Sequence, residues 1–244
     1  MPRPIKSTLR RHSVKSGKTK TGLTASGIKL ARKTGKRELS GKVKGYHSSA
    51  TRAKSTLVYG MQGHKGKKYS KIRVRKELSY YFLKDMAKLE SLVVKHGEEK
   101  FLRMWLDGKV SSRLISKPEE VANLIIKKRF GLGQRVAKLG AKDIMIENVS
   151  HSWIVEAVFE RLTGKKYNTL KPGTMGRFTE GLTINHYKNG KAVLTYRGNS
   201  FNDKKAFSSC PLVCENPSIM WAIPTLYVTN SEVLSNILNN SLSE

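Results

Sequence analysis

Apolar residues recur at intervals of three and four along the middle of the chain, which is the spacing of one face of an α-helix. The pattern is clearest over residues 78–95 and 153–162. Ser116-Lys-Pro-Glu119 has the residues of a capping box with proline in the first turn, so a further helix begins there and ends at Lys127-Lys-Arg129. Two shorter helices are expected over 98–107 and 131–139.

The period changes from helix to strand near residue 180. Leu182, Ile184 and His186 alternate with more polar neighbours, Asn189-Gly190 suits a type I′ turn, and residues 193–196 return as the second strand of a hairpin. Further strands are expected over 143–147 and 219–228, and a last helix opens at residue 229. The fold class predicted is α+β, with a helical first half and a second half that contains the hairpin.

The first 70 residues lack this regularity. They are rich in Lys, Arg, Gly, Ser and Thr with scattered single apolar residues. Such a segment offers too little apolar surface to offset the entropy of ordering, so we expect a largely disordered arm over residues 1–70, followed by one α+β domain over 71–244. Within the arm, residues 24–37 are expected to form a short helix on binding a partner.

The charge of the chain is concentrated in the same segment. Of its first 76 residues, 23 are Lys or Arg and one, Glu38, is acidic, whereas the whole chain has a net charge of +29. A cation density of this kind attracts polyanions and gains from the counterions that they release. The partner predicted is therefore nucleic acid, with DNA favoured over RNA, and no membrane.

The function predicted from this charge is non-catalytic DNA binding through phosphate contacts, in a virion or packaging-associated protein that binds DNA or DNA ends. A ribosome-associated or other RNA-associated structural role is the main alternative, and docking on a larger protein assembly through the cation-free C-terminal segment is another. The residues predicted to bind nucleic acid are Arg10, Arg11, Lys15, Lys18, Lys20, Arg32, Lys33, Lys36, Arg37, Lys42, Lys44, Arg52, Lys54, Lys65, Lys67, Lys68, Lys71, Arg73, Arg75, Lys76, Lys127, Lys128 and Arg129.

A divalent-metal-dependent nuclease is the enzymatic alternative. Glu156 and Glu160 are spaced i, i+4 on one helix, and Glu180 opens the hairpin whose second strand contains Lys191. Nucleases of this class place carboxylates around one or two metal ions, often with a lysine near the attacking water. The tight Glu-x-Lys pair typical of such sites is absent, so these four residues are weak catalytic candidates.

The remaining chemistry-bearing residues do not form a recognisable motif. His64 falls in the expected arm, and His151 and His186 are interpreted as structural or surface residues. Cys210 and Cys214 have no second pair with which to complete a four-cysteine zinc site, so neither a metal nor a cofactor is expected. No apolar run approaches a membrane span, and the protein is expected in the cytoplasm or a virion, with organelle targeting a minor alternative.

Overall fold

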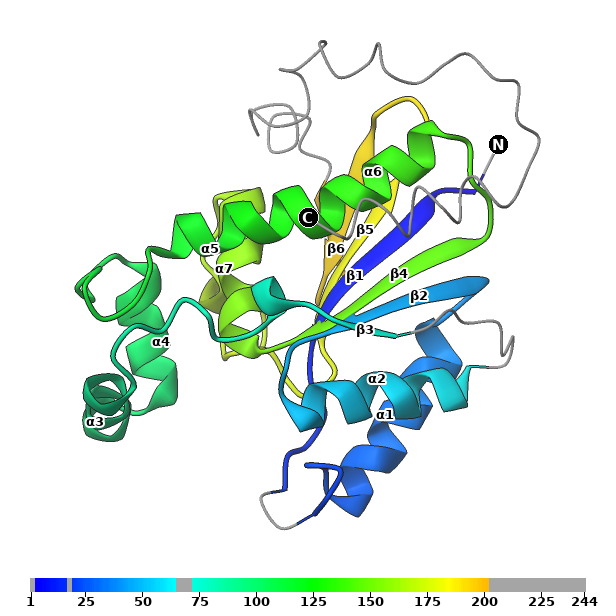
Figure 1. The fold of residues 1–244 in the computed structure, drawn as a ribbon. Coiled ribbons are helices and arrows are strands. Elements are labelled where there is room, and N and C mark those ends of the chain that lie inside the picture. The colour runs from blue at the N-terminus through cyan, green and yellow to red at the C-terminus, as the bar shows by residue number, and fades with distance from the viewer. Residues whose placement is uncertain (1–2, 17–18, 65–71, 202–244) are drawn as a thin grey trace. The chain divides into compact units, whose positions relative to one another are not determined.

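The computed structural model describes residues 3–16, 19–64 and 72–201, which form one mixed β-sheet with helices on both faces (Figure 1). The strands are β1 (Ile5–Arg11), β2 (Lys42–His47), β3 (Arg73–Val74), β4 (Ile144–Ser150), β5 (Gly181–His186), β6 (Ala192–Tyr196) and β7 (Asn199–Phe201). The α-helices are α1 (Ala25–Glu38), α2 (Thr51–Gly63), α3 (Met86–His96), α4 (Glu98–Leu106), α5 (Pro118–Ile125), α6 (Gly131–Lys138) and α7 (Ser152–Thr163). Two 3₁₀ turns, Lys76–Leu78 and Tyr167–Thr169, and a π-helical turn, Ile126–Phe130, complete the described elements.

The strand order is β3-β2-β4-β1-β5-β6-β7. The first four strands in this order pair in parallel, and β5, β6 and β7 continue the sheet in antiparallel pairing. The carboxyl ends of β1, β2 and β4 therefore lie side by side at one edge. In open sheets of this kind, ligands bind beyond the carboxyl ends of the parallel strands.

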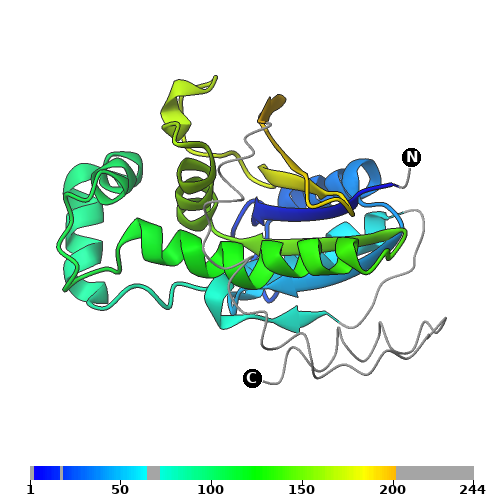
Figure 2. The same cartoon turned by 90° about the horizontal axis from the view of Figure 1, so that it is seen from above.

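The two faces of the sheet are covered by different helices. Helices α1 and α2 lie on one face, and α5, α6 and α7 lie on the other (Figures 1 and 2). Toward α2, a core of buried apolar residues joins strand and helix; it consists of Val43, Ala53, Leu57, Met61, Met145 and Val149. Toward α6, the backbone at Gly133 lies against Ser7 of β1 and His186 of β5. Because strand side chains alternate between faces, successive residues of β1 pack on opposite sides of the sheet.

The structure does not show the disordered basic arm expected over residues 1–70. Residues 5–63 form β1, α1, β2 and α2, and β1 and β2 flank β4 in the middle of the sheet. The glycines that suggested flexibility serve close packing instead: a Cβ built on Gly35 would lie 1.8 Å from the carbonyl oxygen of Gly60, and one on Gly63 would lie 2.1 Å from that of Arg32. Glycine lets the α1 and α2 backbones touch, so a compact unit forms with few large apolar residues.

The structure confirms most elements predicted after residue 97. Helices α4, α5, α6 and α7 and the β5–β6 hairpin lie within a few residues of their predicted positions. The helix expected over 78–95 begins later, at Met86, because Asp85 caps it by accepting a hydrogen bond from the Lys88 amide. The strand expected over 219–228 and the helix after it lie outside the described residues, as do both cysteines.

Among the described residues, the longest and most apolar helices still fall short of what a membrane crossing requires.

Candidate active site

Four side chains converge at the carboxyl edge of the parallel strands, and they come from three separate parts of the chain. Arg11 is the last residue of β1 and His12 follows it directly. Arg52 lies in the first turn of α2, just after β2, and His151 follows β4 at the start of α7. The parallel pairing of β1 and β2 with β4 brings these residues together, and the His12 amide donates to the Ser150 carbonyl at 3.0 Å.

The contacts of His12 define which ring nitrogen carries its proton. Nδ1 lies 2.8 Å from the carbonyl oxygen of Ser13, which can only accept, so Nδ1 donates. Nε2 is consequently unprotonated, and its lone pair accepts a hydrogen bond from Nε of Arg52 at 2.9 Å. This arrangement fixes the ring and presents a neutral imidazole nitrogen beside a guanidinium.

His151 and Tyr80 form the opposite wall of the site. The ring of His151 meets that of His12 edge-on, with centroids 5.4 Å apart, and stacks on Tyr80 at 4.0 Å. Burial raises the pKa of the Tyr80 hydroxyl, and Arg52 lies close enough to that hydroxyl to oppose this effect. Tyr80 thus interacts with two of the four converging residues.

Arg11 is held by the segment that precedes β5, residues 173–180. Its Nη1 donates to the carbonyl oxygen of Gly176 at 2.7 Å, and its guanidinium carbon lies 4.4 Å from the centre of the Phe178 ring. Its Nε is buried and has no hydrogen-bond partner in the described part of the chain; Nδ1 of His151 and Oγ of Ser48 are in the same condition. Buried polar atoms normally have partners, so unpaired donors at this edge fit an anionic ligand.

Burial and neighbouring cations keep both histidines neutral. Burial is the main cause that lowers the pKa of His12 to about 4, with Arg52, Arg11 and Lys15 adding to it against the hydrogen bond to Ser13. Burial also lowers the pKa of His151 to about 2, with His12, Arg52 and Arg11 adding to it. At neutral pH the site therefore combines two guanidinium cations with two uncharged imidazoles.

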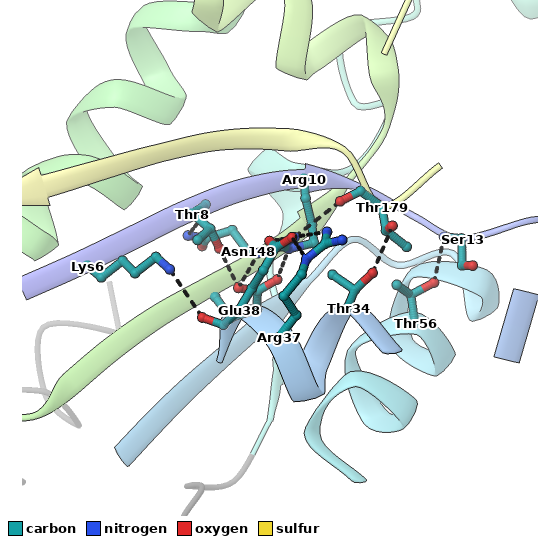
Figure 3. A network of polar contacts seen from close by, with 11 residues as sticks. Lys6, Thr8, Arg10, Ser13, Thr34, Arg37, Glu38, Thr56, Asn148 and Thr179 are labelled. Carbon is teal, nitrogen blue, oxygen red and sulfur yellow. Dashed lines mark hydrogen bonds and ion pairs between the residues drawn. The ribbon is translucent and has the colours of Figure 1, made fainter. Parts of the chain in front are cut away.

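A buried polar network lies directly behind the site (Figure 3). Arg10, on the α1 face of β1, forms an ion pair with Glu147 of β4 and another with Glu38 at the end of α1. The guanidinium also donates to the carbonyl oxygen of Thr179 at 3.1 Å. Arg10 therefore joins the two strands that carry His12 and His151 to the segment that holds Arg11.

The predicted nucleic-acid-binding residues lie in several different environments. Arg11 and Arg52 lie in the candidate site, whereas Arg10 and Arg129 are buried in ion pairs with Glu147 and Glu77. Lys44 is also buried. Lys18, Lys65, Lys67, Lys68 and Lys71 lie outside the described residues. The others are exposed or half-buried; they are Lys15, Lys20, Arg32, Lys33, Lys36, Arg37, Lys42, Lys54, Arg73, Arg75, Lys76, Lys127 and Lys128.

The four weak nuclease candidates do not share one site. Glu160 forms an ion pair with Arg103, and Lys191 is exposed at the hairpin turn. Glu156 and Glu180 approach each other, but both face Arg197. Within the described ranges, no group of three or more His, Cys, Asp or Glu side chains is arranged to hold a metal ion.

The described fold is similar to several solved structures. Bacillus stearothermophilus YhfR superposes with a TM-score of 0.54 at 16% sequence identity, over 80% of this chain and 97% of that one. Phosphoglycerate mutase from Bacillus anthracis superposes with a TM-score of 0.52 at 13% identity, over 86% of this chain and 97% of that one. This chain shares the fold of phosphoglycerate mutase. A mycobacterial glucosyl-3-phosphoglycerate phosphatase in complex with VO3 gives 0.51 at 16% identity, over 79% and 97%. No protein-family model and no curated protein matches the sequence.

These similarities contradict the interpretation of the chain as a non-catalytic DNA-binding or packaging protein, and they contradict the nuclease alternative as well. The named structures that share the fold include a mutase and a phosphatase. The interpretation was wrong because it treated the cations as one solvated surface. Arg10 and Arg129 instead neutralise buried carboxylates, and Arg11 and Arg52 flank a histidine.

Sequence reasoning missed His12 and dismissed His151. The available signal was positional: Arg11 and His12 follow the apolar positions Ile5 and Leu9, and His151 follows residues 144–149 in the same way. A histidine immediately after each of two buried strands points to one sheet edge if those strands are parallel neighbours. The expectation of a disordered arm removed the first strand from consideration.

Proposed function

We propose that this protein is a phosphohydrolase that transfers the phosphoryl group of a phosphate monoester to Nε2 of His12 and then to water. One observation carries the proposal: a neutral histidine, oriented through Nδ1 and with its Nε2 lone pair beside Arg52, stands at a sheet edge with Arg11 and His151. The fold shared with a mutase and a phosphatase supports it.

In the first step, the Nε–H of Arg52 turns from Nε2 of His12 to a phosphate oxygen, Nε2 attacks phosphorus, the bond from phosphorus to the ester oxygen breaks, and a phosphohistidine forms. Arg11 and Arg52 are suited to bind the non-bridging oxygens, because guanidinium groups offer paired N–H donors that match phosphate geometry. The transferred group carries its charge on these oxygens, so their neutralisation lowers the barrier.

The leaving oxygen requires a proton. Among the described hydrogen bonds and ion pairs, none joins a carboxylate to Arg11, Arg52 or either site histidine. Tyr80 stacks its ring on His151, and Arg52 lies near its hydroxyl. Burial raises its pKa to about 12, so the hydroxyl keeps its proton at neutral pH and can donate it to an alkoxide.

In the second step, water attacks phosphorus, the bond between phosphorus and Nε2 breaks, and phosphate leaves with the His12 lone pair restored. A water proton returns to Tyr80 if the tyrosine supplied one in the first step. The low pKa of His12 favours this cycle, because Nε2 stays unprotonated at neutral pH and keeps the lone pair that attacks phosphorus.

The proposal is tested by replacing the nucleophile. We expect the purified protein to hydrolyse p-nitrophenyl phosphate and His12→Asn to lose activity by on the order of 10³-fold or more. Rapid acid-free quenching with a ³²P-labelled monoester should capture a label that survives base and is released by acid, as a P–N bond requires.

His96→Asn is the matched control, since His96 is partly exposed at the end of α3 and outside the site. It should keep full activity and labelling. Hydrolysis that persists in His12→Asn would refute the proposed role of His12, and a folded wild-type protein with no activity on any phosphate monoester would refute the function.

A further inference from the structure

Arg11 depends on a segment that is itself held by a buried carboxylate. The carbonyl oxygen of Gly176 accepts from Nη1 of Arg11 at 2.7 Å, and the amide of the same residue donates to Oε1 of Glu156 at 2.7 Å. Phe178 lies beneath the Arg11 guanidinium. Gly176 is therefore hydrogen-bonded both to Arg11 of the site and to Glu156 of α7.

Glu156 is fully buried, and its other contacts hold it in place. The hydroxyl of Tyr196 donates to it, at 2.9 Å from Oε1 and 3.1 Å from Oε2. A Cβ on Gly176 would lie 3.0 Å from Oε1 of Glu156 and 3.2 Å from the Tyr196 hydroxyl, so the glycine permits the close approach of the segment to the carboxylate.

Among the described residues, the titratable groups that interact with Glu156 are Arg197, Glu180, Tyr167 and Tyr196. Arg197, which follows β6, has Nη2 at 3.8 Å from Glu156 and Nε at 3.4 Å from Glu180, and its side chain is only 2% exposed. Glu180, at the end of the segment, accepts from the Arg177 amide at 2.7 Å. One guanidinium thus faces two carboxylates, and the cluster carries a net negative charge when both are ionised.

We propose that Glu156 is a positioning residue that holds segment 173–180, and through Gly176 the guanidinium of Arg11, in the arrangement that binds the substrate phosphate. This inference rests on the proposed function. Glu156 lies on α7, the helix that begins just after His151, so the contact ties Arg11 to the rigid element beside the second histidine.

The hydrogen bond from the Gly176 amide to Glu156 depends on the protonation state of the carboxylate. Burial raises the pKa of Glu156 to about 7; the Gly176 amide, Arg197 and the Tyr196 hydroxyl oppose this effect, and Glu180 adds to it. Protonation removes the charge that attracts the Gly176 N–H and Arg197. Below neutral pH the segment should therefore loosen and phosphate binding should weaken.

The experiment compares wild type, Glu156→Gln and Glu160→Gln, the last being the same change one turn along α7. We expect kcat/KM of the wild type to fall as pH decreases through about 7, mainly through a higher KM. In Glu156→Gln, kcat/KM should not fall as pH decreases through this range, because the variant should resemble the wild type at acidic pH throughout. At pH 8.5 its kcat/KM should be lower than that of the wild type by up to about 10²-fold. Glu160→Gln should retain the acid limb of the wild-type profile.

A readout without catalysis separates this inference from the proposed function. Amide protection of residues 173–180, which is obtained from the measured hydrogen–deuterium exchange rate by correcting for the pH dependence of intrinsic exchange, should fall in the wild type below pH 7. In Glu156→Gln the protection should be low both below pH 7 and at pH 8.5. Tyr196→Phe, which removes a donor to the carboxylate, should move the wild-type midpoint upward. An unchanged acid limb and unchanged protection in Glu156→Gln, or equal effects in Glu160→Gln, would overturn the proposal even if hydrolysis through His12 is established.

Discussion

Breaking the buried ion pair between Arg10 and Glu147 by removing one partner should strongly destabilise the sheet next to the site. The two side chains are 5% and 4% exposed, and Glu147 also accepts from the Thr8 hydroxyl. In Glu147→Gln the shape is kept but the charge is lost, so Arg10 remains buried with Glu38 as its remaining carboxylate. Removal of one partner from a buried pair costs about 3 to 5 kcal/mol. Since Glu38 still compensates in part, we expect the lower end, about 3 kcal/mol.

Urea unfolding monitored by tryptophan fluorescence measures this loss as a lower midpoint with an unchanged slope. For a domain of this size the same change corresponds to a melting temperature lower by about 6 to 12 °C. Glu38→Gln is the matched control: Glu38 is 28% exposed, and its loss should cost about 1 kcal/mol or less.

Arg10→Met combined with Glu147→Leu should recover most of the stability lost in Glu147→Gln, because no uncompensated charge stays buried. A loss below about 1 kcal/mol in Glu147→Gln, or a double variant less stable than the single one, would refute this reasoning.

The remaining predictions concern the proton donor and the crossing of α1 and α2. Tyr80→Phe should slow hydrolysis of alkyl phosphates by about 10²-fold and that of p-nitrophenyl phosphate, whose leaving group needs no proton, by much less; equal losses in steady-state assays would argue against proton donation. Gly35→Ala should destabilise the protein by about 3 kcal/mol, because its Cβ would meet the Gly60 carbonyl oxygen. Gly60→Ala meets nothing closer than 3.8 Å and should be neutral or more stable by up to about 1 kcal/mol, and urea unfolding that ranks the two variants otherwise would contradict this description of the crossing.

The expectation that nucleic acid is a partner of this protein stays a prediction. Exposed cations of α1, among them Arg32, Lys33 and Lys36, remain available to a polyanion. The structure changes what such binding would mean, since Arg11 and Arg52 are already engaged at the candidate site.

Local patterns in the sequence predicted the later elements well and the first ones poorly, apart from the helix expected over 24–37, which is α1. Helix α7 follows from apolar spacing, and the β5–β6 hairpin follows from alternating apolar residues and a turn that requires glycine. Both signals depend only on residues that are close together in the sequence. Strand β1 carries Lys6, Thr8 and Arg10 toward α1, so its composition looks like that of a solvated segment. No local rule could reveal that Glu147, far along the chain, compensates Arg10.

The sequence by itself determined the periodicity of the helices, the hairpin turn, the absence of a four-cysteine metal site and the large excess of cations. Only the tertiary structure decided which cations are buried and which residues meet at the site. The physical reason is that strand order and direction are long-range properties: parallel pairing of β1 and β2 with β4 places His12, Arg52 and His151 at one edge. Burial at that edge then lowers the pKa of both histidines, so that His12, which the sequence did not single out, becomes a candidate nucleophile beside His151.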